Sequence, residues 1–349
     1  MKSPSKHIII TCLFILSAFF VGCSSTERQT LQSQRPVRYY DSSFPDQNVS
    51  LQIADIFKSI KRIRSTVFYT TYEFSPAQRI TRAQLDTLDL KKYAKRRVKF
   101  NQSTAGTAIA ISTTPNHVTF LTCAHTLTFP ERLIQYLSKK NIPEKTFILS
   151  VSVKERQQNT IFNLPLLGAF EVLAIDNARD LALLSLPIKN GQVDIPAFDY
   201  PLGQPEALQW GSFVYIIGFP KGFPMVTRAI VSDPNRDSYH SFIMDALFNQ
   251  GISGGIILAI RGGAPNFEWV GMANTTAAHQ EYILSPHPDK AATYPPYVPY
   301  SDSIYVESRT HIEYGITQSI SMDKIRSFIR ENADRFKRGD FDRVKYYLD

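Results

Sequence analysis

Short apolar runs alternate with clusters of glycine, proline and asparagine from about residue 100 onward. The runs are rich in β-branched and aromatic side chains, which is the pattern of strands joined by turns. Many short strands at this spacing predict an all-β fold, a sandwich or barrels, rather than an α/β fold. The predicted strands are Thr107–Ile111, Val118–Thr122, Thr146–Val153, Phe170–Ile175, Ala182–Leu186, Phe213–Ile217, Arg228–Val231, Phe242–Asp245, Gly255–Ala259, Trp269–Met272 and Gly315–Ile320.

The segments on either side of this region follow other patterns. Apolar residues at three- and four-residue spacing predict a short amphipathic helix from Ile53 to Ile63. The β-branched and aromatic run from Val67 to Phe74 predicts a strand, and residues 75–98 look helical and charged, as in an insertion. Residues 49–99 are therefore expected to form a helix and strand extension, and Met322 to Phe336 a closing helix.

The chain begins like a targeting segment. A short positive stretch is followed by an apolar run from Ile8 to Val21, which is too short for a membrane span and suits a signal peptide. The run ends in Gly22 and Cys23, and this small residue before a cysteine resembles the bacterial lipobox, although Phe20 replaces the usual leucine. The resemblance implies cleavage after residues 1–22 and lipidation of Cys23, with several acyl chains for stable anchoring.

That anchoring places the protein in a bacterial cell envelope, attached to the membrane through Cys23. Ser24 after the cysteine resembles the outer-membrane sorting pattern of two-membraned bacteria, and the periplasmic and surface-exposed faces both remain open. An ordinary signal peptide with a chance cysteine is the alternative. Residues 23–48 are rich in Ser, Gln, Pro and Arg without apolar periodicity, so we expect them to form a tether.

Composition narrows the function classes. The net charge is +8, and Lys2 and Lys6 lie in the targeting segment, which leaves +6. The most basic run, from Lys91 to Arg97, has no nucleic-acid-binding module around it, so a solvated helix face or linker is preferred over nucleic-acid binding. Cys123 has no partner once Cys12 and Cys23 are removed or modified, so a disulfide scaffold is not expected. No His or Cys cluster shows metal-ligand spacing, and no cofactor is expected.

Three patches carry chemistry. A predicted strand runs into His125, whose imidazole can act as a general base near neutral pH. Asp180 heads an apolar strand, where its carboxylate can fix the tautomer of a histidine. Ser253 lies between Gly251 and the Gly254-Gly255 pair, and such a turn can aim the backbone N–H groups of Gly251 and Ser253 at a developing oxyanion. Taken singly, each patch could have a purely structural role: the histidine could be a structural residue, the aspartate could belong to a turn at the start of a strand, and the serine could lie in a glycine-rich hairpin.

Together, in the order His, Asp, Ser, the patches resemble those of the trypsin-like, chymotrypsin-fold serine peptidases, and most of all the bacterial HtrA-type branch. The resemblance covers about residues 100–330. It rests on Gly106-Thr-Ala, Thr-Cys-Ala-His125, Asp180-Leu-Ala-Leu-Leu, Leu202-Gly203, the segment from Gly211 to Gly222, Asp245-Ala246, Asn249, Gly251, Ser253-Gly254-Gly255, Val270-Gly271 with Asn274, and Tyr314-Gly315-Ile316 before the closing helix.

The resemblance implies two six-stranded antiparallel β-barrels with a C-terminal helix, and a triad of His125, Asp180 and Ser253 in the cleft between the barrels. Gly251 and Ser253 would supply the oxyanion hole. The protease domain is expected at 100–333 and a helical tail at 334–349. Leu247, Ala273 and Asn274 would line the pocket for the residue before the cut, with small or medium apolar residues preferred. The expected function is a serine endopeptidase that acts on a protein or peptide.

Several positions depart from the family pattern. Ile252 replaces the usual Asn or Asp before the nucleophile, and Ala229 stands where glycine is common. No PDZ-like domain follows the closing helix, which leaves the oligomeric state open. The Pro- and Tyr-rich segment from Ser285 to Arg309 is a candidate substrate- or partner-facing loop.

Two alternative functions remain. A catalytically silent protease-fold lipoprotein would act as a binding or adhesion module. A lipase or esterase is disfavoured because the histidine and aspartate precede the serine.

Overall fold

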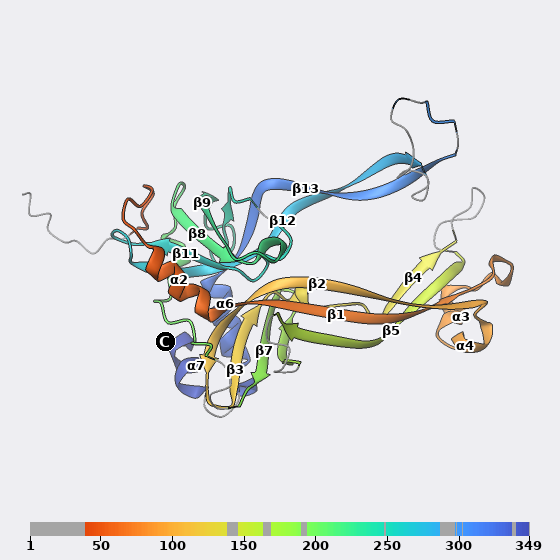
Figure 1. Ribbon diagram of the computed structural model, residues 1–349, viewed down its shortest axis with the longest axis horizontal. Coiled ribbons are helices and arrows are strands. Elements are labelled where there is room, and N and C mark those ends of the chain that lie inside the picture. Colours follow the sequence, from red (N-terminus) through yellow and green to blue (C-terminus); the bar gives the residue numbers. More distant parts are fainter. Residues whose placement is uncertain are drawn as a thin grey trace, which may run out of the picture. The chain divides into compact units, whose positions relative to one another are not determined.

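Two antiparallel β-sheets form the fold (Figure 1). The computed structural model describes residues 39–137, 146–162, 169–189, 194–247, 249–286, 297, 299–301, 303–336 and 340–348. In the N-terminal sheet seven strands follow the order β4-β5-β1-β2-β3-β7-β6. These strands are β1 (Ile60–Glu73), β2 (Arg96–Thr113), β3 (His117–Thr122), β4 (Arg132–Tyr136), β5 (Ile148–Ile161), β6 (Glu171–Asp176) and β7 (Leu181–Pro187).

The second sheet closes into a six-stranded barrel in the order β10-β13-β12-β11-β8-β9. Its strands are β8 (Phe213–Gly218), β9 (Met225–Asp233), β10 (Ile243–Met244), β11 (Ile256–Ile260), β12 (Phe267–Pro286) and β13 (Ile304–Ser321). The α-helices are α2 (Ser50–Ser59), α3 (Arg82–Leu85), α4 (Leu90–Tyr93), α6 (Met322–Glu331) and α7 (Phe341–Leu348). Short 3₁₀ turns are η1 (Pro76–Gln78), η2 (Ala124–Thr126), η4 (Pro205–Ala207), η5 (Pro220–Gly222) and η6 (Ala333–Arg335).

One apolar core joins the two sheets. A single cluster of buried side chains contains Ile109 and Leu183 of the first sheet, Leu258 and Trp269 of the barrel, and Phe328 of α6. Strands β3, β7 and β8 are buried over almost their whole length, which explains why they read as continuous apolar runs in the sequence. The strands next to the catalytic candidates all contribute to this core: His125 follows β3, Asp180 precedes β7 and Ser253 precedes β11.

The all-β class, the chymotrypsin-like pairing of two sheets and the C-terminal helix are confirmed. All eleven strands predicted from residue 100 onward fall on observed strands. The first unit differs in detail from the expected six-stranded barrel, because it is a curled seven-stranded sheet. The predicted helix from Ile53 to Ile63 ends at Ser59, since Ile60 and Ile63 are buried on the inner face of β1.

The distal halves of β1, β2 and β5 form an arm beyond this core. Residues 74–95 fold over its far end with a separate apolar cluster that includes Phe74, Ile80, Leu85 and Val151. The basic run Lys91–Arg97 lies there, and its side chains are exposed apart from the half-buried Ala94. Strand β4 was missed in the sequence because its five residues are mostly polar or half-exposed.

Strands β12 and β13 run out of the barrel as a long hairpin (Figure 1). They pair as far as Pro286 and Ile304, so both ends of the predicted 285–309 loop belong to strands. The middle of that loop, at residues 287–296, lies outside the described residues.

The N-terminal segment is described only from Tyr39 onward, so the predicted signal peptide, Cys23 and most of the tether lie outside the described residues. The last residues of the predicted tether contact the barrel. The Tyr40 hydroxyl donates to Glu268 at 2.6 Å, and Asp41 accepts from the backbone of Phe213 at 2.8 Å. Among the described helices, none is long and apolar enough to cross a membrane. The proposed domain boundaries stay predictions.

Candidate active site

His125 lies in the 3₁₀ turn η2, immediately after the buried strand β3. The turn is held by the hydroxyl of Thr126, which donates to the carbonyl of Cys123 at 2.7 Å. The Ala124 amide donates to the carbonyl of Asp180 at 3.2 Å. Ala124 and Thr126, on either side of His125, are buried, whereas the His125 side chain is 39% exposed. The strand therefore ends so that only the imidazole reaches the surface.

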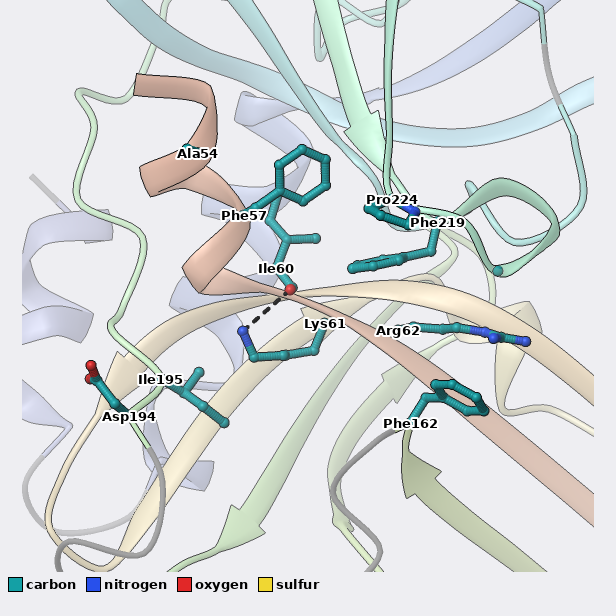
Figure 2. Close-up of a pocket in the computed structure, with 11 residues that line it drawn as sticks. Ala54, Phe57, Ile60, Lys61, Arg62, Phe162, Asp194, Ile195, Phe219 and Pro224 are labelled. Atoms are coloured by element: carbon teal, nitrogen blue, oxygen red, sulfur yellow. Dashed lines mark hydrogen bonds between the residues drawn. The ribbon is translucent and has the colours of Figure 1, made fainter. Parts of the chain in front are cut away.

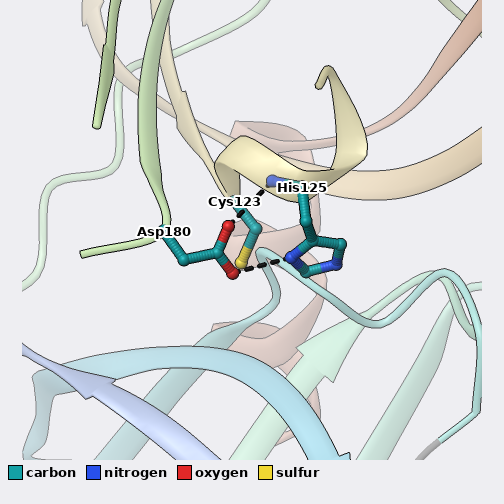
Figure 3. A group of neighbouring side chains, drawn as sticks. All are labelled: Cys123, His125 and Asp180. Atoms are coloured by element: carbon teal, nitrogen blue, oxygen red, sulfur yellow. Dashed lines mark hydrogen bonds and ion pairs between the residues drawn. The ribbon is translucent and has the colours of Figure 1, made fainter. Parts of the chain in front are cut away.

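Asp180 stands at the end of the β6–β7 turn with a left-handed backbone (φ 56°), which Asp tolerates better than most residues. One carboxylate oxygen accepts from the His125 ring nitrogen Nδ1 at 2.6 Å, and the other accepts from the His125 backbone N–H at 2.8 Å (Figure 3). With Nδ1 as donor, Nε2 is left as the acceptor, which is the tautomer a general base needs. Arg179 fixes the turn from the other side through ion pairs to Asp176 and Glu331.

Ser253 is 6% exposed and lies in a tight turn flanked by two glycines with positive φ, Gly251 at 103° and Gly254 at 85°. Thr107 holds this turn. Its N–H donates to the Ser253 carbonyl at 2.8 Å, and its hydroxyl donates to the Gly251 carbonyl at 2.9 Å. A Cβ on Gly254 would lie 1.9 Å from the Thr107 carbonyl oxygen, so only glycine fits. Sequence reasoning placed Thr107 in a strand and missed this role.

Gly106 brings the two halves of the site together. A Cβ on Gly106 would lie 2.7 Å from Cγ2 of Thr126 and 3.3 Å from the Ser253 carbonyl oxygen. The missing side chain therefore lets β2 pass between the histidine turn and the serine turn. In the described part of the chain the Ser253 hydroxyl makes no hydrogen bond to His125. Catalytic hydrogen bonds are often long in ligand-free enzymes and tighten when substrate binds.

Two backbone N–H groups in the serine turn are free to bind an anion. Among the described residues, neither the Gly251 nor the Ser253 amide donates a hydrogen bond, whereas the amide of Ile252 between them donates to the Asn249 carbonyl at 3.1 Å. This arrangement leaves the two expected oxyanion donors available. The Ile252 side chain is 2% exposed and packs in the barrel core, so its replacement of a polar residue adds nothing to the cleft surface.

Cys123 is fully buried beside the His125–Asp180 pair (Figure 3). Its thiol donates to the Ala273 carbonyl at 3.5 Å. Burial raises the pKa of the Cys123 thiol well above its usual range, and the Asp180 carboxylate raises it further. Cys123, His125 and Asp180 lie close enough to share a metal ion. Binding there would require the thiol to lose its proton, which burial and the carboxylate oppose.

The predicted pocket residues lie in different environments. Ala273 is buried in β12 and accepts from the Gly254 amide at 2.8 Å, which ties this strand to the serine turn. The side-chain oxygen of the neighbouring Asn274 is buried without a hydrogen-bond partner. Leu247 is 65% exposed. The assignment of these residues to a substrate pocket stays a prediction.

A second group with possible metal ligands lies on the barrel surface. Glu206, His240 and Asp323 are close together, and His240 Nδ1 bonds Asp323 at 2.8 Å. Exposed carboxylates beside a histidine are common without a metal ion, so this group carries no functional assignment.

Comparison with known proteins adds a family match. Residues 106–265 match the trypsin-like peptidase domain, and this range contains His125, Asp180 and Ser253. No curated protein matches the sequence significantly. Among solved structures, the chain is similar to an HtrA-type protease, a variant of AlgW with a decapeptide. The two sequences are 16% identical and the TM-score is 0.40. The match covers 82% of this chain and 68% of that chain. AlgW with a tripeptide is 15% identical, with a TM-score of 0.41 and coverage of 82% and 63%. Residues 106–265 are therefore similar to the trypsin-like peptidase domain.

Proposed function

We propose that the protein is a serine endopeptidase of the bacterial cell envelope. The observation that carries this proposal is the His125–Asp180 pair, held by two hydrogen bonds next to a glycine-flanked serine turn with two free amides. This arrangement supports acyl transfer, because Gly106 lies against both the histidine turn and the serine turn and so keeps base, nucleophile and oxyanion donors near one another.

Each group has one role in the proposed reaction. The Ser253 hydroxyl attacks the scissile carbonyl carbon while His125 Nε2 accepts its proton. Asp180 stabilises the imidazolium that forms, and the amides of Gly251 and Ser253 bind the oxyanion. His125 then donates the proton to the leaving amine. A water molecule, activated by the same imidazole, hydrolyses the acyl-enzyme at Ser253.

Labelling with a fluorophosphonate probe tests this function. A neutral serine reacts appreciably only beside an assembled base and oxyanion hole, so we expect the wild type to be labelled and both Ser253→Ala and His125→Ala to lose at least 99% of the signal, an effect of about 10² or more. Ser42→Ala is the matched control, because Ser42 is exposed outside the site and should leave labelling unchanged. A folded wild-type protein that stays unlabelled before and after limited proteolysis would favour a catalytically silent binding module instead.

Envelope anchoring is the second part of the proposal, and it rests on the lipobox-like sequence around Cys23. Lipidation adds several acyl chains, so the wild type should partition into the detergent phase of a Triton X-114 extraction. Cys23→Ser should carry no acyl chains and keep the signal peptide attached, as intact mass shows. Cys123→Ser is the matched control and should still partition into detergent. Wild-type protein found only in the aqueous phase would refute the anchor.

A further inference from the structure

A cationic pocket of about 370 Å³ lies beside the serine turn. Three positive side chains line it, Arg62 and Arg64 from β1 and Lys221 from the turn after β8. Gln250 and Ala105 form the wall nearest the catalytic candidates. No carboxylate in the described residues lines the pocket, so its charge is one-sided.

The pocket is within reach of a substrate bound at Ser253. Gln250 directly precedes the oxyanion residue Gly251, and its carbonyl accepts from the Lys221 amide at 2.8 Å. Ala105 directly precedes Gly106, whose Cβ position lies 3.3 Å from the Ser253 carbonyl oxygen. Two residues of the pocket lining therefore directly precede residues of the catalytic candidate site, Ala105 before Gly106 and Gln250 before Gly251.

The cations that face the pocket are not neutralised from within the described part of the chain. Arg62, Arg64 and Lys221 form no ion pair there, and the Nε of Arg62 is buried without a hydrogen-bond partner. The Arg62 guanidinium stacks on Phe162 at 4.3 Å and rests against Gly222, where a Cβ would lie 2.5 Å from it (Figure 2). Packing on both sides holds this charge in place. Arg62 is half-buried, and a partly desolvated cation without an ion-pair partner favours an incoming anion.

A larger cavity of about 800 Å³, whose lining Figure 2 shows, shares Arg62 and Gly222 with the cationic pocket. Its other walls are mainly apolar, with Phe57 from α2, Phe162 after β5 and Phe219 after β8. A side chain next to the one in the cationic pocket would meet this apolar surface.

We propose that the cationic pocket binds an acidic side chain of the substrate after the scissile bond, and that the adjoining cavity takes a bulky apolar side chain beyond it. The assignment to that side of the bond rests on the proposed function. The residue before the cut is expected near Ala273 and Asn274, on β12, whereas the pocket is built from β1, β2 and the turn after β8. In a peptide bound at Ser253, the residues before the scissile bond would lie along β12, and the residues after it would lie at the pocket.

The test begins with cleavage sites mapped by mass spectrometry in a digest of an unfolded protein mixture. We expect Asp and Glu to be enriched within three residues after the cut, and Phe or Leu at the next position. Matched quenched peptides with Glu, Gln or Lys at the enriched position then give kcat/KM. Glu should exceed Gln by about fivefold, and the ratio should fall as salt is raised. A Phe-to-Gly change at the following position should lower kcat/KM by about tenfold.

Two variants assign the preference to this pocket. Arg64→Gln, which leaves Arg62 and Lys221 in place, should lower the Glu-to-Gln ratio by at least half, and Arg64→Glu should lower the ratio further. Arg97→Gln on β2 removes the same charge far from the site and should keep the wild-type ratio. Equal cleavage of Glu and Gln peptides by a wild type that the fluorophosphonate labels would overturn the subsite and leave the endopeptidase intact. A wild type that neither labels nor cleaves would overturn both.

Discussion

Replacing Asp180 by asparagine is expected to lower kcat by about four orders of magnitude while the fold stays intact. In the structure the carboxylate accepts two hydrogen bonds from His125, one from ring Nδ1 and one from the backbone. An amide offers its NH₂ group to Nδ1, which favours the ring tautomer with the proton on Nε2. That proton blocks abstraction from Ser253, and the imidazolium loses its anionic partner. Initial rates at saturating peptide measure the effect.

Asp176→Asn is the matched control for this prediction. Asp176 lies in the same turn and its loss removes the same charge. An asparagine there can still accept from the backbone amides of Ala178 and Arg179, which Asp176 bonds at 2.9 and 3.0 Å. We expect its kcat to stay within about tenfold of the wild type. If Asp180→Asn is also within tenfold of the wild type, Asp180 does not fix the base and the triad assignment is wrong.

Replacing Asp340 by alanine is expected to lower the free energy of unfolding by about 3 kcal/mol. Asp340 precedes α7 and is fully buried. Its carboxylate accepts from Ser112 at 2.5 Å and from Thr119 at 3.0 Å, and bonds Nε2 of His117 at 2.9 Å. Alanine would leave these three polar groups of the first sheet buried without their partner. Urea unfolding in a Ser253→Ala background measures the loss without self-digestion.

Asp334→Ala provides the comparison for Asp340. Its side chain is 76% exposed and pairs with Arg335 at 3.7 Å, so removal should change the unfolding free energy by less than about 0.5 kcal/mol. Should Asp340→Ala be as stable as Asp334→Ala, the buried carboxylate contributes little beyond the cost of burying it. If Asp340→Ala does not fold at all, Asp340→Asn, which keeps one acceptor oxygen, should fold with a smaller loss of unfolding free energy than alanine would cause.

The catalytic candidates could be predicted from the sequence because each lies in a short local pattern. His125 and Asp180 adjoin apolar strands, and Ser253 sits among glycines that a tight turn requires. These signals need no knowledge of distant contacts. The same is true of the strands between residues 100 and 320, since burial makes them apolar and turns separate them.

Other features depend on contacts that leave no local pattern. Thr107 supports the serine turn through a hydrogen bond to Gly251, 144 residues later in the sequence. No local sequence pattern around Thr107 indicates that role. Strand β4 and the first half of β2 carry mostly exposed or half-exposed side chains, so the hydrophobic pattern did not identify them as strands. The cationic pocket likewise joins residues from β1, β2 and the turn after β8, which only the fold brings together.

The contacts of Asp340 also set an order of events during biosynthesis. The carboxylate joins groups 221 to 228 residues apart along the chain, while Tyr347 in the same segment packs against Trp269 of the barrel with ring centroids 6.1 Å apart. The side chains of Ser112, His117 and Thr119 therefore exchange water for the Asp340 carboxylate only after residue 340 has been synthesised and has docked. The last polar contacts of the first sheet therefore form after every catalytic candidate has been synthesised, because residue 340 follows His125, Asp180 and Ser253 in the chain.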